Sequence, residues 1–287
     1  MKKSIISVIV LMFFTCPLWA QNSVDGGKKA QREIVAQELE GFNLSGYSEG
    51  GQKSWDIKGD KAHIHGDDVA VTNVNAYSYG KENMNVTAKE GNIDKATGDV
   101  NLKRDVVVTA ESGATLKTET LQWQRNNDLV QTNDKVRIED KGMTVSGQGM
   151  EAHPSLKDAK LRSDVTADIL SEGKDKKADN RIQITCDGSM EVDQATQSAV
   201  FTNNAVAIEI STGRKVKSDR MEVKFDKDSR KIKEIICTGN VEVHQGMNIT
   251  YSETLVYKAD EQRMIMTGKP KLLIDPGDKT SSAILNY

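Results

Sequence analysis

Few side chains in this chain of 287 residues have the types and spacing that a metal site requires. His63 and His65 stand two positions apart, so on a strand both would face the same side, and Asp67 and Asp68 follow them. A zinc site normally needs three or four ligands, and no further ligand stands out nearby. We therefore expect a hydrated strand face here and no metal.

Catalytic side chains are equally hard to assemble from the sequence. The carboxylates Asp219, Glu222, Glu191 and Glu253 recur in step with the repeats described below, as residues of turns and hydrated faces do. The sequence shows no Ser/His/Asp or Cys/His grouping and no Gly-rich phosphate loop after a strand. We expect no enzyme and no cofactor, and a net charge of -3 argues against a nucleic-acid partner.

The cysteines leave two alternatives open. Cys186 and Cys237 are the cysteines that remain if the N-terminal segment is removed. Outside the cytoplasm an even pair is compatible with a disulfide, which requires Cα atoms within about 7 Å. The other interpretation is two small thiols buried separately in the core.

Residues 1–20 have the composition of a targeting segment. Lys2 and Lys3 precede the apolar run Ile5–Phe14, and the small residue Ala20 offers a signal-peptidase site. Two alternatives compete with cleavage: an uncut membrane anchor at the short limit of a bilayer span, and lipidation of Cys16. All three place the rest of the chain outside the cytoplasm.

The segment that follows is polar. Residues 21–41 carry only a thin apolar stripe, so we expect a linker or a short helix there, with the ordered part starting near Phe42. A second charged stretch, residues 171–181, is predicted to be a linker or long loop, and residues 277–287 a tail.

The rest of the chain repeats one pattern: a short alternating strand, a charged turn and a longer alternating strand. The short strands return roughly every 30 residues, which is a repeat-architecture spacing. A hairpin with one apolar face cannot bury that face alone, whereas stacked hairpins can. The pattern predicts an all-β fold, an elongated jellyroll or solenoid of stacked antiparallel hairpins.

Two stretches resemble known families. Gly50, Trp55, Ile57, Ala62 and the pair Asn73-Val74 resemble the opening of LptC, a membrane-anchored periplasmic component of lipopolysaccharide export, and the likeness covers residues 42–170. Residues 182–276 resemble the LptA/OstA-type repeat, with Gly239–Val243 as the most typical phrase. One long jellyroll and two tandem jellyrolls both remain open.

The apolar strand faces are the candidate binding site. They are either an ordinary core or a groove for acyl chains, with Lys103 and Lys227 expected on hydrated faces. Flexible, polarisable Met side chains suit either role. The candidate residues are Ile93, Val106, Val108, Leu121, Trp123, Val136, Ile138, Met150, Met190, Val192, Val206, Ile208, Met221, Val223, Val241, Val243, Leu255 and Tyr257.

The resemblance implies a periplasmic transport protein, with or without an anchor in the inner membrane. Its expected partners are lipopolysaccharide or a similar amphiphile, other jellyroll components joined edge to edge by β-augmentation, and an inner-membrane ABC exporter that supplies the energy. The alternative function is a structural or carbohydrate-binding β-solenoid of the cell envelope. The low aromatic content of 5% counts against sugar binding.

Overall fold

The computed structural model describes residues 37–47, 50–79, 83–140, 142–153, 158–170, 181–227, 231–261 and 263–274. They fall into two compact units, which we call the N-terminal unit (to Thr132) and the C-terminal unit (from Asn133). The predicted targeting segment, the charged stretch up to residue 180 and the tail lie outside the described residues. The predicted block boundaries at residues 170 and 182 stay predictions.

Nearly all described residues belong to antiparallel strands, which confirms the all-β prediction. No helix in the described part of the chain is long and apolar enough to cross a membrane. The one helical element with described residues is a short 3-10 turn, η2 (Arg125–Asn127).

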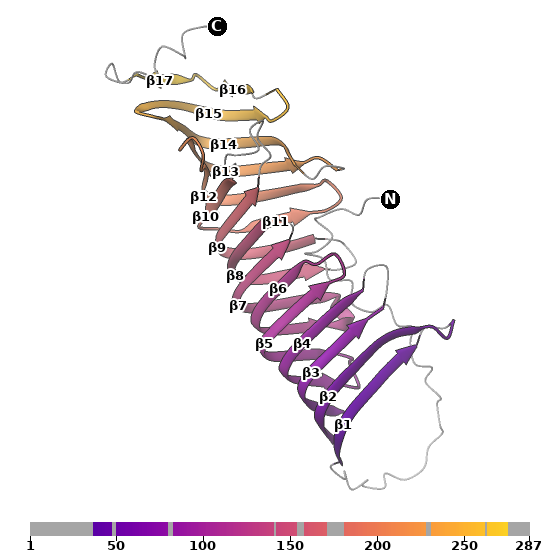
Figure 1. The fold of residues 1–287 in the computed structure, drawn as a ribbon. Helices are drawn as coiled ribbons and strands as arrows, with labels where there is room; N and C mark the ends of the chain where they lie inside the picture. The colour runs from indigo at the N-terminus through magenta and orange to yellow at the C-terminus, as the bar shows by residue number, and fades with distance from the viewer. Residues whose placement is uncertain are drawn as a thin grey trace, which may run out of the picture. The chain divides into compact units, whose positions relative to one another are not determined.

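In the N-terminal unit, each strand pairs with the next strand along the chain (Figure 1). β1 begins five residues before Phe42, inside the range expected to be a linker, because Gln37 to Glu40 continue the ladder with β2. The strands are β1 (Gln37–Tyr47), β2 (Lys53–His65), β3 (Asp68–Ser78), β4 (Met84–Asp94), β5 (Val100–Ala110) and β6 (Thr115–Gln124).

β7 (Leu129–Asp140) begins in the N-terminal unit and ends in the C-terminal unit. The C-terminal unit continues with the same antiparallel pattern (Figure 1). Its strands are β8 (Met143–His153), β9 (Asp158–Leu170), β10 (Arg181–Cys186), β11 (Met190–Asp193), β12 (Ser198–Glu209), β13 (Lys215–Phe225), β14 (Ile232–Gln245), β15 (Asn248–Lys258), β16 (Arg263–Thr267) and β17 (Lys271–Leu273).

Several long strands bend near their middle at residues in the left-handed region, and we call this line the crease. Short Asn and Asp side chains tolerate positive φ, which explains their choice here. The residue after each of them is buried, with an exposure of 6% or less. The bent residues are Asn73, Asp105, Asp164, Asn204 and Asn240, and the buried followers are Val74, Val106, Val165, Ala205 and Val241.

The intervening strands pass the crease with small residues. A Cβ added to Gly91 in β4 would lie 2.8 Å from Val74 Cγ2, so glycine is required by the close approach of β3. In β13, the Ser218 hydroxyl donates to the Arg220 carbonyl at 3.0 Å, and Ser252 makes the same bond to Thr254 in β15 at 3.2 Å. At the crease, Ser hydroxyl groups thus bond to backbone carbonyls two residues further along the same strand.

Each unit buries the inner faces of its bent strands. The fully buried side chains of largest volume are Phe201, Met150, Ile184, Met221 and Leu255, all in the C-terminal unit. In the N-terminal unit the largest are valines, among them Val71, Val106 and Val130.

Candidate functional site

Most of the predicted apolar site residues lie on the inner faces and are at most 9% exposed. Ile93 and Tyr257 share these faces, because they pair with the buried Val69 and Ile235, but they are only half-buried. The buried members are Val106, Val108, Leu121, Trp123, Val136, Ile138, Met150, Met190, Val192, Met221, Val223, Val241, Val243 and Leu255.

Val206 and Ile208 are the exceptions, and their predicted placement on the apolar face is wrong. They pair with Lys217 and Lys215 on the outer face of the strand pair β12–β13. The inner positions belong to Ala205 and Ala207, with exposures of 0% and 7%.

A bulge beside the crease separates these positions from Phe201. Asn203 and Asn204 both have positive φ, and the ladder with β13 skips from Thr202 to Ala205. The bulge sets two residues of β12 against one of β13, so the odd-numbered residues of β12 face inward on both sides of it. Alternation counted from the buried Phe201 is therefore the signal that could have placed the two alanines inside. The prediction from the sequence followed the larger side chains instead, and it also missed Phe201 and Ile184, which are 1% and 0% exposed.

One inner row runs through most of the C-terminal unit, and we call it the methionine row. Each member is directly opposite the next across a strand pair, so their side chains share a face. All are at most 4% exposed except Met266, which is half-buried. In order, the row is Met150, Leu161, Met190, Phe201, Met221, Cys237, Leu255 and Met266.

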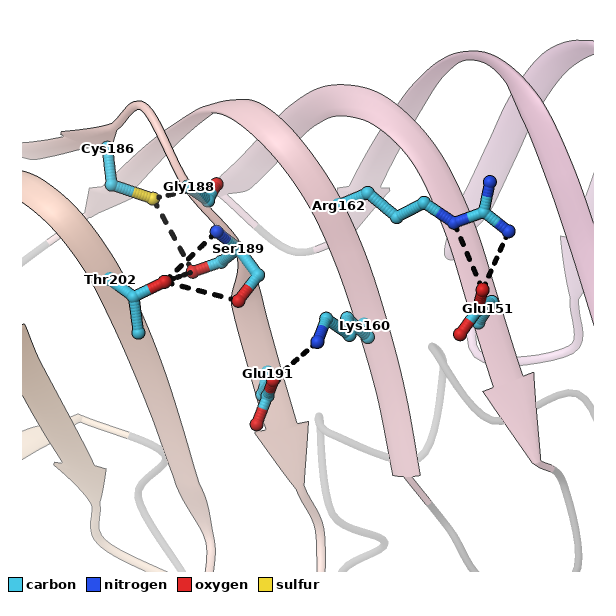
Figure 2. A network of polar contacts seen from close by, with 8 residues as sticks. All are labelled: Glu151, Lys160, Arg162, Cys186, Gly188, Ser189, Glu191 and Thr202. Carbon is cyan, nitrogen blue, oxygen red and sulfur yellow. Dashed lines mark hydrogen bonds and ion pairs between the residues drawn. The ribbon is translucent and has the colours of Figure 1, made fainter.

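The thiols report how apolar this interior is. Burial raises the pKa of Cys237 to about 11, against a small opposing hydrogen bond with Ser218. Burial also raises the pKa of Cys186, whose thiol donates to the carbonyls of Gly188 and Ser189 at 3.5 and 3.6 Å (Figure 2). Both shifts follow from the burial of the thiols, since burial disfavours the charged thiolate.

The disulfide between Cys186 and Cys237 is not formed, because both cysteines are free and buried. β12 and β13 lie between the strands that carry them, β10 and β14. Three strand spacings amount to roughly 14 Å, well beyond what a disulfide spans. Of the two alternatives, separate core thiols are the correct one.

The outer faces are polar, as expected. Lys103 and Lys227 are exposed. The recurring carboxylates are in surface contacts: Glu222 Oε2 lies 3.1 Å from Arg220 Nη2, and Asp219 Oδ2 accepts from Asn240 Nδ2 at 2.9 Å. Among the described residues, no group of three or more His, Cys, Asp or Glu side chains has the arrangement of a metal site.

The strands on either side of the charged stretch pair directly with each other. β9 pairs with β10 from Leu170–Arg181 to Val165–Cys186, and then with β11 from Leu161–Met190 onward. β10 and β11 also both pair with β12, so together they fill one strand position. We call this ladder the junction.

Polar contacts hold the junction together (Figure 2). Between β10 and β11, Ser189 N donates to Thr202 Oγ1 at 3.1 Å, and Thr202 Oγ1 donates to the Ser189 carbonyl at 3.2 Å. Lys160 Nζ lies 2.8 Å from Glu191 Oε1 across the strand pair β9–β11. The break in the strand is therefore ordered.

Comparison with known families gives two matches in chain order. A family model described as "Lipopolysaccharide-assembly, LptC-related" matches residues 6–170. A second, described as "LptA/(LptD N-terminal domain) LPS transport protein", matches residues 183–287. No curated protein matches the chain. These families are transport components rather than enzymes, and their proteins act in the cell envelope.

The two matches meet at the junction, where the strands of one family pair with those of the other. The first match covers more than half of the chain, and the second accounts for most of the remainder. The chain therefore belongs to the LptC-related family of lipopolysaccharide assembly, carries an LptA-type block after it, and has a role in lipopolysaccharide transport.

Proposed function

We propose that this protein carries lipopolysaccharide through the periplasm, with the acyl chains held between the inner faces and the saccharide in water. The observation that supports this most is the methionine row, an unbroken apolar line that continues across the junction between two transport families. Each buried methylene is worth about 0.8 kcal/mol, so a few acyl chains would be held strongly.

The inner faces are packed against each other, so the lipid must displace side chains to enter. Met150, Met190 and Met221 can adapt through rotamer changes, because Met is unbranched and polarisable. The acyl chains would thus replace side-chain contacts rather than fill an empty channel. The adaptable part of the proposed path would then lie in the C-terminal unit, which contains these methionines.

The second part of the proposal is that the chain bridges two other β-domains. Among the described strands of the N-terminal unit β1 pairs with β2 alone, and in the C-terminal unit the short strands β16 and β17 both pair with β15. Strand edges of this kind accept another strand through backbone hydrogen bonds. The junction supports the idea, because it joins two transport blocks by such a ladder within one chain.

At the β1 edge the expected partner is the inner-membrane ABC exporter, which supplies the energy. At the β15–β17 edge it is a further jellyroll component on the way to the outer membrane. Residues 1–20 would be cleaved on export, anchor the chain in the inner membrane or be lipidated at Cys16, and in each case the rest of the chain would lie in the periplasm.

The test is photocrosslinking in cells with a photoreactive amino acid at Leu121 or Met221. Val206 is the matched control, since it is apolar but lies on the outer face, and Lys103 is a polar outer-face control. We expect lipopolysaccharide adducts at Leu121 and Met221 and none at the controls. A folded, exported protein without inner-face adducts would refute the groove and favour a structural β-solenoid of the envelope.

A further inference from the structure

Exposed tyrosines gather at one place on the outer face of the N-terminal unit. Tyr47, Tyr77 and Tyr79 are 59%, 45% and 40% exposed. The whole chain has six tyrosines and only 5% aromatic residues, so this is a local concentration. Each tyrosine lies in or directly after a strand end of β1 or β3.

The side chains are arranged in contact with one another. The rings of Tyr77 and Tyr79 are stacked, with centroids 6.0 Å apart and planes inclined by 27°. Lys53 Nζ lies 5.6 Å from the centroid of the Tyr79 ring and 2.9 Å from Asp56 Oδ2. In the ladders, Tyr47 is opposite Lys53, and Asp56 is opposite Tyr77.

Asp56 lies beneath this surface. Its side chain is only 8% exposed, and its Oδ1 has no hydrogen-bond partner among the described residues. Burial works against ionisation of Asp56, but the nearby Lys53 ammonium and Tyr79 hydroxyl outweigh it and lower the pKa of the carboxyl group. The cluster therefore combines a cation and two stacked rings with a buried, charged carboxylate that holds the Lys53 ammonium group in place.

We propose that Lys53, Asp56, Tyr77 and Tyr79, the tyrosine patch, bind a saccharide unit of the lipopolysaccharide head group. The C–H face of a sugar ring stacks on an aromatic ring, and its hydroxyl oxygens accept from an ammonium group, here that of Lys53, which Asp56 holds in position. Stacked exposed tyrosines next to a Lys–Asp pair offer each of these contacts. The proposal rests on the proposed function, because it assigns the part of the lipid that the interior does not hold.

The position of the tyrosine patch fits a lipid whose acyl chains lie in the interior and whose sugars lie outside it. Trp55 and Ser78 pair with each other and belong to the inner row that continues to the buried Met84. Their sequence neighbours Asp56, Tyr77 and Tyr79 are on the opposite face of the same strand ends, since side chains alternate along a strand. A lipid that passes over these strand ends therefore meets the interior with its chains and the patch with its sugars.

The test uses the full chain and a lipopolysaccharide saccharide from which acyl chains and phosphates have been removed. We expect calorimetric titration to detect binding that weakens roughly fivefold or more in Tyr77→Ala/Tyr79→Ala and in Lys53→Gln. Tyr251→Ala is the matched control, because Tyr251 is 37% exposed in β15 of the C-terminal unit, and it should leave the affinity unchanged.

Absence of saccharide binding by the wild-type chain, or equal affinity of all variants, would overturn the patch. Thermal unfolding shows whether each variant is folded, and Lys53→Gln keeps the inference testable if the double Tyr variant is not. Crosslinking at Met221 reports separately on the proposed function. Adducts at Met221 in a protein without saccharide binding would refute the patch alone, whereas absence of adducts with saccharide binding intact would refute acyl-chain carriage.

Discussion

The two units fill the same architecture with different side chains. The methionine row of the C-terminal unit contains Met190, Phe201 and Met221. The corresponding row of the N-terminal unit, followed through its ladders, consists of small and branched residues with two leucines: Ala62, Val71, Gly91, Leu102 and Leu121. Both rows are buried, except for the half-buried Met266 at the end of the methionine row.

The difference between the two rows shows that burial and adaptability are separate properties of an apolar interior. Val has a restricted χ1, and Ala and Gly have no side-chain rotamers, so the N-terminal row is stiff apart from its two leucines. Met has three rotatable bonds and fills irregular space. Burial alone is therefore a poor guide to which part of the path adapts to a lipid.

The largest expected effect on stability comes from truncating Phe201, the fully buried side chain of largest volume. Phe201→Ala should reduce the free energy of unfolding of the C-terminal unit by about 3–5 kcal/mol, because the cavity left between Met190 and Met221 collapses only partly. Val71→Ala in the N-terminal row should cost less, roughly 2 kcal/mol, since less apolar surface is lost than with the phenyl ring of Phe201. Amide hydrogen exchange measures both units separately. Equal losses would show that the two interiors are packed alike.

Adding a methyl group at the crease tests how well each interior tolerates extra volume. Gly91→Ala places Cβ 2.8 Å from Val74 Cγ2, whereas Gly147→Ala in the C-terminal unit meets Ser163 O at 3.2 Å and Leu161 at 3.3 Å. Overpacking typically costs about 1–3 kcal/mol, and we expect Gly91→Ala at the upper end because Val74 is stiff. Denaturant unfolding provides the measurement. A larger loss for Gly147→Ala would contradict a stiffer N-terminal interior.

The smallest effect concerns pH and is confined to the C-terminal unit. The pKa of Cys237 is raised to about 11 in the folded protein, above the ordinary value of about 8.5 for an unfolded thiol. The protonated Cys237 thiol stabilises the folded protein fully at pH values below the pKa of the unfolded thiol. This stabilisation is lost as the pH rises through the pKa of the folded thiol. The difference in unfolding free energy between the wild type and Cys237→Ala should therefore shrink between about pH 8.5 and 11. A constant difference would mean that solvent reaches the thiol.

Much of the fold could be predicted from the sequence because it repeats a local rule. Leu121, Met150, Met190, Met221 and Leu255 were placed on the inner face by alternation alone, and each is at most 4% exposed. The prediction failed in β12, where it followed the large side chains of Val206 and Ile208, although alternation from the buried Phe201 places the small residues Ala205 and Ala207 inside.

Other features depend on long-range geometry that no local pattern contains. Which strands separate Cys186 from Cys237 is decided by the ladder order. The start of β1 at Gln37 depends on a partner more than twenty residues away, since Gln37 is opposite Ile64. The tyrosine patch joins residues of β2 with residues at the end of β3, and none of them carries a signal on its own.

The ladders also determine how such a chain acquires its structure. Within each unit almost every strand pairs with its immediate neighbour in the chain, as β2 does with β3 and β13 with β14. Contacts between sequence neighbours give a low contact order, and repeat architectures of this kind grow by adding one unit to an existing edge. Each new hairpin needs only the strand made just before it as a template. A chain delivered across a membrane from its N-terminal end can therefore fold progressively during delivery.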